Sequence, residues 1–413
     1  MSAGLGGRWL RPPHWVPCRA PSRVLRCTLV WALTALLLGG CSTLPMWMVL
    51  QRQSQITDYR HFDNATLSRA AFPSALPAAP AALNWPGGLH GAAAEADIAQ
   101  HGTVALLVAR RGQLIYERYF NGYSADSIAT SFSLAKSVVS VLLGIAIDQG
   151  RIGSVDQPIT RFLPELLAQD ARFGRITLRH LLMMRSGIQF DEGYRSPFTE
   201  AAHFYLTPDL PREVAALRIE GEPDQAYAYK SGDTQLLAMA IERAVGQPLA
   251  LFASQRLWQP MGAMHDASWS LDSQASGVAR GFCCLNARAV DYLRFGLMVL
   301  AEGQWNGQQI VSAQWLRDST VAQAGRPGAS DAAQRNIERD GTPQAAFYAW
   351  QWRRQPVPGS VPLQPGSAVY AQGLYGQVLL IDPASQTVVL RLGQRTGARH
   401  WPGWMAALLR LNP

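Results

Sequence analysis

The chain has 413 residues, of which 48% are hydrophobic and only 16% charged, with 36 glycines and 26 prolines. This balance is that of a globular protein, and it excludes a disordered, collagen-like or coiled-coil chain. The formal net charge is +8, but the first 40 residues hold five arginines and no acidic residue, so the remainder carries +8 − 5 = +3. The basic charge therefore belongs mainly to the N-terminal segment and does not point to nucleic-acid binding.

The N-terminal segment has the pattern of an export signal. Arginines precede an apolar run at 27–38, and Gly-Gly-Cys41-Ser follows it. A basic start, a short apolar run and small residues before a cleavage site are typical of a secretory signal. Leu-Gly-Gly-Cys also resembles a bacterial lipobox, in which the cysteine is diacylated. We therefore expect 1–41 to be a lipoprotein signal peptide and Cys41 the site of lipidation.

This interpretation predicts a protein held at a membrane of the bacterial cell envelope, on the periplasmic side. The alternative is an N-terminal transmembrane anchor, because residues 45–50 are again largely apolar. The run at 27–38 is short for a membrane span, however, and Gly, Ser and Pro interrupt its continuation.

After the signal, residues 42–90 are predicted to form a tether, since 70–86 is rich in alanine and proline. A folded domain is expected over 91–413. Its pattern begins with a β-hairpin, followed by a helix and further helical segments, and it ends with an aromatic run, two strands and a last helix. In chain order these elements are predicted at 103–109 with 114–120, 132–149, 178–184, 234–245, 347–352, 376–381, 387–392 and 401–411.

Strands near both ends of this domain with helices between them favour an α+β fold. We expect an antiparallel sheet formed by N- and C-terminal strands, flanked by helices, with an inserted, mainly helical subdomain. Outside the signal region the cysteines are an adjacent pair, Cys283 and Cys284. Adjacent Cα atoms are closer than disulfide-bonded residues usually are, so we expect two small buried apolar residues and no redox or metal site.

Several common functional motifs are missing from the sequence. There is no Gly-x-Ser-x-Gly, no Walker loop, no His-Glu-x-x-His and no Cys-x-x-Cys, and the eight histidines have no ligand spacing. These absences favour neither a metal nor a nucleotide, and we expect no cofactor.

Three segments carry chemistry. The first is Ser133-Leu-Ala-Lys136, which opens the apolar helix; Lys136 and Lys230 are the two lysines among 37 basic residues. Residues i and i+3 share a helix face, so a serine hydroxyl and an amine would lie side by side. A desolvated lysine can accept the proton of such a serine. By itself a serine three residues before a lysine is a weak signal.

The second segment is Tyr229-Lys-Ser231, just before the helix at 234–245; it supplies a phenol for proton transfer, although an aromatic loop before a capped helix would look the same. The third is the run 370–377, YAQGLYGQ, which enters a strand. Its glycines allow close approach of a substrate, and a backbone N–H there can complete an oxyanion hole with the Ser133 N–H. An ordinary glycine bulge is the alternative.

The order of these segments resembles the β-lactamase-related serine hydrolases: class C β-lactamases, penicillin-binding carboxypeptidases, family VIII esterases and 6-aminohexanoate-oligomer hydrolases. Residues 176–187, ITLRHLLMMRSG, and 281–296, GFCCLNARAVDYLRFG, are similar to further family segments, and 303–310 follows in the expected place. The similarity spans about residues 90–411.

The resemblance implies roles for individual residues. Ser133 corresponds to the acyl-accepting nucleophile, Lys136 to its base or proton relay and Tyr229 to the phenol acid/base. The N–H groups of Ser133 and Leu374 correspond to the oxyanion hole. Substrate contacts are implied for Tyr194, Ser231, Gln372 and Gly373.

Two departures shape the expected function. The β-lactam-active members carry Asn where this chain has Ser231, and Lys-Thr-Gly where it has Ala371-Gln372-Gly373. Loss of that lysine removes a partner for a substrate carboxylate. We therefore expect a serine hydrolase of esters or small amides, without a metal or nucleic-acid partner. A penicillin-binding or β-lactamase-type activity and a catalytically idle binding module of the cell envelope are the alternatives.

Overall fold

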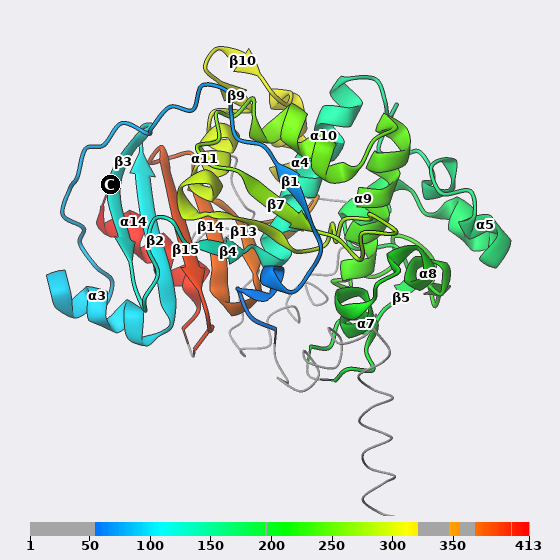
Figure 1. Cartoon of the computed structure of the whole chain (residues 1–413), viewed down its shortest axis with the longest axis horizontal. Helices are drawn as coiled ribbons and strands as arrows, with labels where there is room; N and C mark the ends of the chain where they lie inside the picture. The colour runs from blue at the N-terminus through cyan, green and yellow to red at the C-terminus, as the bar shows by residue number, and fades with distance from the viewer. Residues whose placement is uncertain (1–53, 195, 321–346, 355–367, 398, 413) are drawn as a thin grey trace, which may run out of the picture. The chain divides into compact units, whose positions relative to one another are not determined.

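The computed structural model describes residues 54–194, 196–320, 347–354, 368–397 and 399–412. All of them belong to one of the two compact units of the chain, Met48–Pro413 (Figure 1). The predicted signal peptide and Cys41 lie outside the described residues.

The largest sheet is built from both ends of this unit, as the sequence predicts. In the described part it has seven antiparallel strands. In spatial order they are β11 (Phe347–Ala349), β12 (Trp352–Arg354), β13 (Val369–Gly373), β14 (Gln377–Asp382), β15 (Thr387–Gly393), β2 (Thr103–Arg110) and β3 (Gln113–Tyr119). Figure 1 shows the early strands β2 and β3 beside the late strand β15.

The central strands are apolar on both faces because helices cover both faces of the sheet. On one face α3 (Gly91–Gln100) and α14 (Trp401–Leu411) pack against β2 and β14. On the other face α11 (Ala289–Leu300) packs against β2, β14 and β15. This arrangement explains why β15, with the sequence TVVLRLG, is buried at every position instead of at alternate ones.

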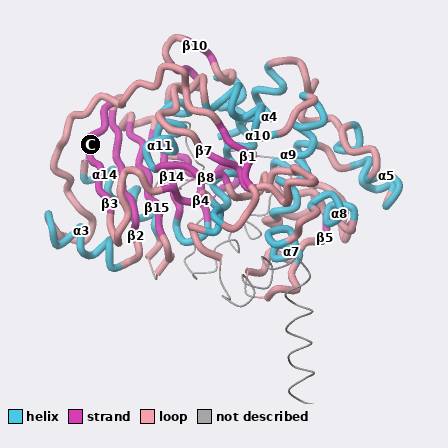
Figure 2. Tube along the Cα trace, in the orientation of Figure 1, coloured by secondary structure: helices cyan, strands magenta, loops and turns pink. Residues whose placement is uncertain are grey.

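The inserted helical region lies between β4 and β7. It is organised around α4 (Ala135–Asp148) and α9 (Ser231–Val245), which contact each other. Figure 2 shows α5, α7, α8 and α9 together at the right of the view, away from β2, β3 and β15 at the left. The other helices of the described residues are α5 (Leu166–Gln169), α6 (Leu178–Leu182), α7 (Glu200–Leu206), α8 (Leu210–Ala215), α10 (Leu249–Ala253) and α12 (Ala313–Thr320).

Short elements complete the architecture. A four-stranded sheet has the order β1 (Asn64–Leu67), β7 (Ala267–Ser270), β8 (Leu285–Arg288) and β4 (Ile128–Thr130). Two-stranded pairs are β5 (Ile188–Gln189) with β6 (Arg218–Ile219), and β9 (Gln304–Trp305) with β10 (Gln308–Gln309). The single-turn helices are η1 (Asp58–Arg60), η2 (Phe132–Leu134), η3 (Ile159–Arg161), η4 (Ala171–Arg175), η5 (Ser254–Trp258, a π-helical turn) and η6 (Leu374–Gly376).

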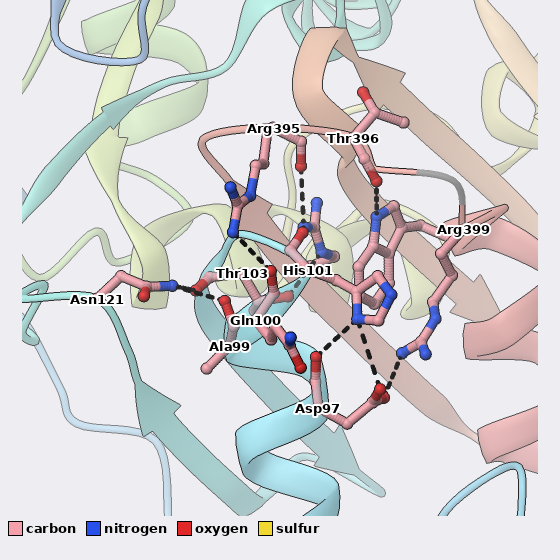
Figure 3. A network of polar contacts seen from close by, with 11 residues as sticks. Asp97, Ala99, Gln100, His101, Thr103, Asn121, Arg395, Thr396 and Arg399 are labelled. Atoms are coloured by element: carbon pink, nitrogen blue, oxygen red, sulfur yellow. Dashed lines mark hydrogen bonds and ion pairs between the residues drawn. The ribbon is translucent and has the colours of Figure 1, made fainter.

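A polar network ties the two ends of the unit together at the start of β2 (Figure 3). Asp97 of α3 accepts from Arg399 (Nη1 to Oδ2, 2.7 Å), which precedes α14, and its backbone carbonyl contacts His101 Nδ1 at 2.7 Å. Arg395 donates to the carbonyl of Gln100 at 2.6 Å. The loop between β15 and α14 is thereby fixed to the first helix of the folded domain.

The predicted tether is wrong for residues 54–90. This segment is part of the folded unit, since β1 pairs with β7 and the side chains of Ile56, Leu67 and Trp85 are buried. The alanine- and proline-rich composition of 70–86 conceals these anchoring side chains. Burial of a few large apolar groups is enough to hold an otherwise irregular segment on the surface of a domain.

The cysteine pair also differs from the prediction. Cys283 and Cys284 are buried, as expected, but they form a disulfide bond with each other. The Cα atoms are 3.8 Å apart, the spacing of any adjacent residues. The backbone accommodates the bond at Cys284, which adopts a left-handed conformation with φ of 69°.

No single helix among residues 54–412, masked positions aside, has the length and apolar character needed to cross a membrane. The pair Ser231–Val245 and Leu249–Trp258 meets that test jointly by length and composition, with a bend of 77°.

Candidate active site

Ser133 and Lys136 lie together at the junction between η2 and α4. The Lys136 Nζ is 3.1 Å from the Ser133 Oγ, as the three-residue spacing predicts. Ser133 is partly exposed, whereas Lys136 is only 1% exposed. Phe132, immediately before Ser133, has a φ of 46°, which is unusual for a bulky residue. Backbone strain of this kind is often found at functional sites.

Among the residues that the structure describes, the Lys136 amine has three oxygen neighbours. Besides the Ser133 Oγ, these are the Ser231 Oγ at 3.1 Å and the backbone carbonyl of Phe282 at 2.9 Å. The Ser231 hydroxyl comes from the first residue of α9, and Phe282 directly precedes the cysteine pair. Three separate parts of the chain therefore fix the position of this amine beside the serine.

Tyr229 also lies close to the amine. The Lys136 Nζ is 5.0 Å from the centre of the Tyr229 ring, a cation–π geometry. The Tyr229 ring also packs edge-on against Tyr348 of β11, and the guanidinium of Arg353 from β12 lies 5.3 Å from its centre. The structure thus brings the three predicted catalytic side chains into one cluster.

The end of β13 reaches the backbone just before Ser133. A Cβ atom at Gly373 would stand 2.2 Å from the Ser131 carbonyl oxygen, so glycine is required for this approach. Leu374 is the next residue, at the start of η6. The predicted oxyanion pair therefore comes from two adjoining backbone segments.

Gln372 is placed differently from the other predicted substrate-contacting residues. Side chains alternate along a strand, so that of Gln372 leaves the opposite face of β13 from position 373. Its amide oxygen is buried and has no hydrogen-bond partner among the described residues. No hydrogen bond in the described part of the chain joins its amide oxygen to Ser133, Lys136 or Tyr229, and its role in substrate binding stays a prediction.

Tyr194 and Ser231 are joined by a residue that the sequence did not single out, Glu192. Its carboxylate accepts from the Ser231 backbone N–H and from the Ser231 hydroxyl, both at 2.6 Å, and from the Tyr194 hydroxyl. Tyr194 itself is 49% exposed. Desolvation of its hydroxyl and the neighbouring charge of Glu192 raise the pKa of Tyr194 well above its usual value.

A second buried polar cluster lies next to the site, around the other lysine. Lys230 is 2% exposed, and its Nζ is 3.4 Å from the Ser186 Oγ. The Ser186 hydroxyl donates to Asp233 Oδ1 at 2.7 Å. Burial raises the pKa of Asp233 to about 7, although the positive charge of Lys230 and the Ser186 hydrogen bond act in the opposite direction.

Glu192, Arg353 and the Phe282 carbonyl were missed by sequence reasoning. Glu192 is 39 residues from Ser231, and Arg353 belongs to a strand at the far end of the chain. In the sequence, only its position two residues before Tyr194 could have drawn attention to Glu192. That position does not reveal the contact with Ser231. Within the described residues, no group of three or more His, Cys, Asp or Glu side chains is placed to hold a metal ion.

The fold and this cluster together define a serine hydrolase of the β-lactamase type. The sequence matches the family described as Beta-lactamase over residues 91–409, and the chain belongs to that family. This confirms the resemblance drawn from the motifs.

Two characterised relatives are hydrolases. The chain is 27% identical to a 6-aminohexanoate-dimer hydrolase of Paenarthrobacter ureafaciens, over 74% of this chain and 77% of that protein. It is 28% identical to the esterase EstB of Burkholderia gladioli, over 39% of this chain and 45% of that protein. A solved structure described as a 6-aminohexanoate-dimer hydrolase of Bacillus anthracis has the same fold, with a TM-score of 0.70, 22% identity, and coverage of 86% of this chain and 92% of that one.

Proposed function

We propose that this enzyme hydrolyses esters or small amides through an acyl-enzyme on Ser133. The observation that carries the proposal is the 3.1 Å contact between the Ser133 Oγ and an almost fully buried lysine amine. The names of the two relatives, a hydrolase of a small amide and an esterase, support this substrate class.

In the proposed reaction the Ser133 hydroxyl gives its proton to neutral Lys136 as Oγ attacks the substrate carbonyl carbon. The oxyanion is held by the N–H groups of Ser133 and Leu374. The intermediate collapses, the bond to the leaving group breaks, and the proton held by Lys136 passes through Tyr229 to that group. Water then attacks the acyl carbon while Tyr229 and Lys136 carry its proton in the opposite direction, back to the Ser133 oxygen. The bond between that oxygen and the acyl group breaks, and the acid is released.

The test is covalent labelling by a fluorophosphonate probe together with turnover of short p-nitrophenyl esters. We expect the wild-type protein to be labelled and Ser133→Ala to lose both labelling and turnover. Tyr229→Phe is expected to lower turnover by about 10²–10⁴-fold, the usual contribution of a positioned acid or base. Unchanged turnover in Ser133→Ala would refute the mechanism, and an unlabelled, inactive wild-type protein would favour the idle binding module.

Activity on β-lactams is the second candidate, and Arg353 is the observation that favours it, because it places a cation next to Tyr229. We expect nitrocefin turnover far below ester turnover, since β13 has Ala371 where β-lactam-active relatives have lysine. Nitrocefin hydrolysis as efficient as ester hydrolysis would reverse this preference.

The proposed location is the periplasmic side of a bacterial membrane, through a lipid on Cys41. The diacylglyceryl group of a lipoprotein supplies two acyl chains, enough for stable anchoring. We expect Cys41→Ser to leave the membrane fraction. Retention of that variant in the membrane with an uncleaved N-terminus would indicate a transmembrane anchor instead.

A further inference from the structure

Glu192 holds Ser231 at the position where α9 begins beside Lys136. Its two carboxylate oxygens accept hydrogen bonds from both donors of Ser231. The hydroxyl donates to Oε1 and the backbone N–H donates to Oε2, each at 2.6 Å. The Ser231 hydroxyl has one proton, and it uses that proton in the hydrogen bond to Glu192. The Ser231 Oγ can therefore only accept in its 3.1 Å contact with Lys136.

The hydrogen bond from the Ser231 hydroxyl to Glu192 determines the orientation of the lysine amine. A neutral amine has two N–H donors and one lone pair. The Phe282 carbonyl, 2.9 Å away, can only accept, and the Ser231 Oγ has no proton left to offer. Both N–H bonds of neutral Lys136 are thus directed to these two acceptors. The lone pair is left facing the third neighbour, the Ser133 hydroxyl.

We propose that Glu192 is a positioning residue, which acts through Ser231 to direct the lone pair of neutral Lys136 at the Ser133 hydroxyl. This inference rests on the proposed function, because it assigns Glu192 a task in the activation of Ser133. Lys136 becomes an ammonium when it takes the serine proton. The Glu192 carboxylate, which is linked to Lys136 through the Ser231 hydroxyl, also stabilises this positive charge.

The electrostatic surroundings of Glu192 come from several segments. Tyr194 lies on its own loop, Tyr227, Tyr229 and Asp233 lie in or next to α9, and Arg353 comes from β12. Lys230, next to Ser231 in the sequence, adds a further positive charge that acts on Asp233. Removal of the Glu192 charge takes away one of the negative groups in these surroundings. A nearby negative charge then no longer favours the ammonium over the neutral amine in the proposed reaction, so we expect the pH profile of kcat/KM to change.

Glu192→Gln tests this role. The amide has one acceptor oxygen instead of two, so the two donors of Ser231 can no longer each bind an oxygen of their own. We expect kcat on short p-nitrophenyl esters to fall by about 10–100-fold, KM to change by less than about threefold, and the pH midpoint of kcat/KM to shift. Glu200→Gln is the matched control, since Glu200 accepts from the Asp191 backbone N–H in the same loop. The control should keep wild-type kcat and midpoint.

Ser231→Ala provides an independent variant, since it removes the hydroxyl and keeps the backbone N–H that Glu192 caps. We expect a similar loss of kcat, and a double variant scarcely worse than either single one, because both substitutions break the same chain of hydrogen bonds. If Glu192→Gln fails to fold, the kcat of Ser231→Ala alone tests the proposed role of Glu192.

The outcomes separate this inference from the function on which it rests. Ser133→Ala with full turnover overturns the proposed function. An inactive Ser133→Ala together with wild-type kcat and midpoint in Glu192→Gln or Ser231→Ala overturns the inference alone. A lower melting temperature with an unchanged pH midpoint would reduce Glu192 to a helix cap and also overturn it.

Discussion

The two lysines of the chain are both buried, at 1% and 2% exposure, yet their surroundings differ. Lys136 contacts the proposed nucleophile, whereas Lys230 contacts Ser186 in the neighbouring polar cluster. Because side chains alternate along an extended segment, we expect that the Lys230 side chain points away from those of Tyr229 and Ser231, and from this geometry alone that its replacement by arginine costs little. Its burial changes the second expectation, because a guanidinium needs more room and more hydrogen-bond acceptors than an ammonium.

We therefore expect the two lysine-to-arginine variants to fail in different ways. Lys136→Arg should lose ester turnover almost completely, because a guanidinium does not give up its proton. Lys230→Arg should have a lower melting temperature, with kcat per folded molecule within about threefold of wild type. Thermal unfolding and kcat, normalised to the folded fraction, distinguish them. Equal activity of the two variants would remove Lys136 from its role as proton acceptor.

Asp233 gives a pH-dependent stability. Its pKa is about 7 in the folded protein and 3.8 in the unfolded chain, so the folded state binds more protons between these values. The free energy of unfolding therefore falls as the pH rises from 4 to 7, by as much as roughly 4 kcal/mol at about 1.4 kcal/mol per pKa unit. Below pH 4 both states are protonated, and this cost is absent.

Asp233→Asn should remove this contribution, since an asparagine amide oxygen can still accept from Ser186 and carries no charge. Urea unfolding at pH 5 and pH 8 measures the effect. We expect a smaller loss of stability between these pH values in the variant than in the wild type. Glu242, whose pKa burial also raises to about 7, keeps its own contribution in both proteins. An identical loss in both would show that Asp233 is ionised throughout.

At the scale of elements, the site depends on how closely β13 approaches the segment before Ser133. Gly373→Ala would put a methyl group 2.2 Å from the Ser131 carbonyl oxygen, so either β13 or η2 must move. Displacement of the Leu374 N–H should lower kcat by about 10²–10³-fold, the usual loss for one oxyanion donor. In Gly221→Ala, the control, the new methyl group meets no atom within 4 Å. Equal kcat in both variants would contradict the assigned oxyanion hole.

Local patterns predicted the elements and the parts of the site that depend on them. Ser133 and Lys136 share a helix face by their spacing, and the alternating and apolar runs identified β2, β14 and β15. The contacts of Glu192 with Ser231 and of Arg353 with Tyr229 join loops and strands distant in sequence. Such contacts depend on the tertiary fold, so neither spacing nor composition could reveal them.

The errors have the same origin. The segment 54–90 looked like a tether because proline and alanine dominate part of it, while its role depends on the few side chains that reach the core. The adjacent cysteines were judged by the usual Cα spacing of disulfides, which does not take account of the left-handed backbone at Cys284.

At the scale of the molecule, residues 54–90 should be needed for folding. Ile56, Leu67, Leu83 and Trp85 are all buried, and β1 covers an edge of β7. Each such side chain contributes about 2 kcal/mol, and together they approach the whole stability of a typical domain. A chain that starts at residue 54 should unfold cooperatively and keep ester turnover, whereas one that starts at 91 should be insoluble or unfolded. Circular dichroism and turnover compare them, and equal stability would restore the tether interpretation.

The pairing of β2 with β15 imposes an order of events on the newly made polypeptide. β2 ends at Arg110 and β15 begins at Thr387, so one of the longest strand pairs forms only after almost all of the chain has been synthesised. Until then the apolar strand β2 presents an open edge, the kind of surface that associates with other chains. Closure of so long a loop is also intrinsically slow. Such late closure fits the export proposed above, because the chain cannot complete its main sheet before its last strands have been made.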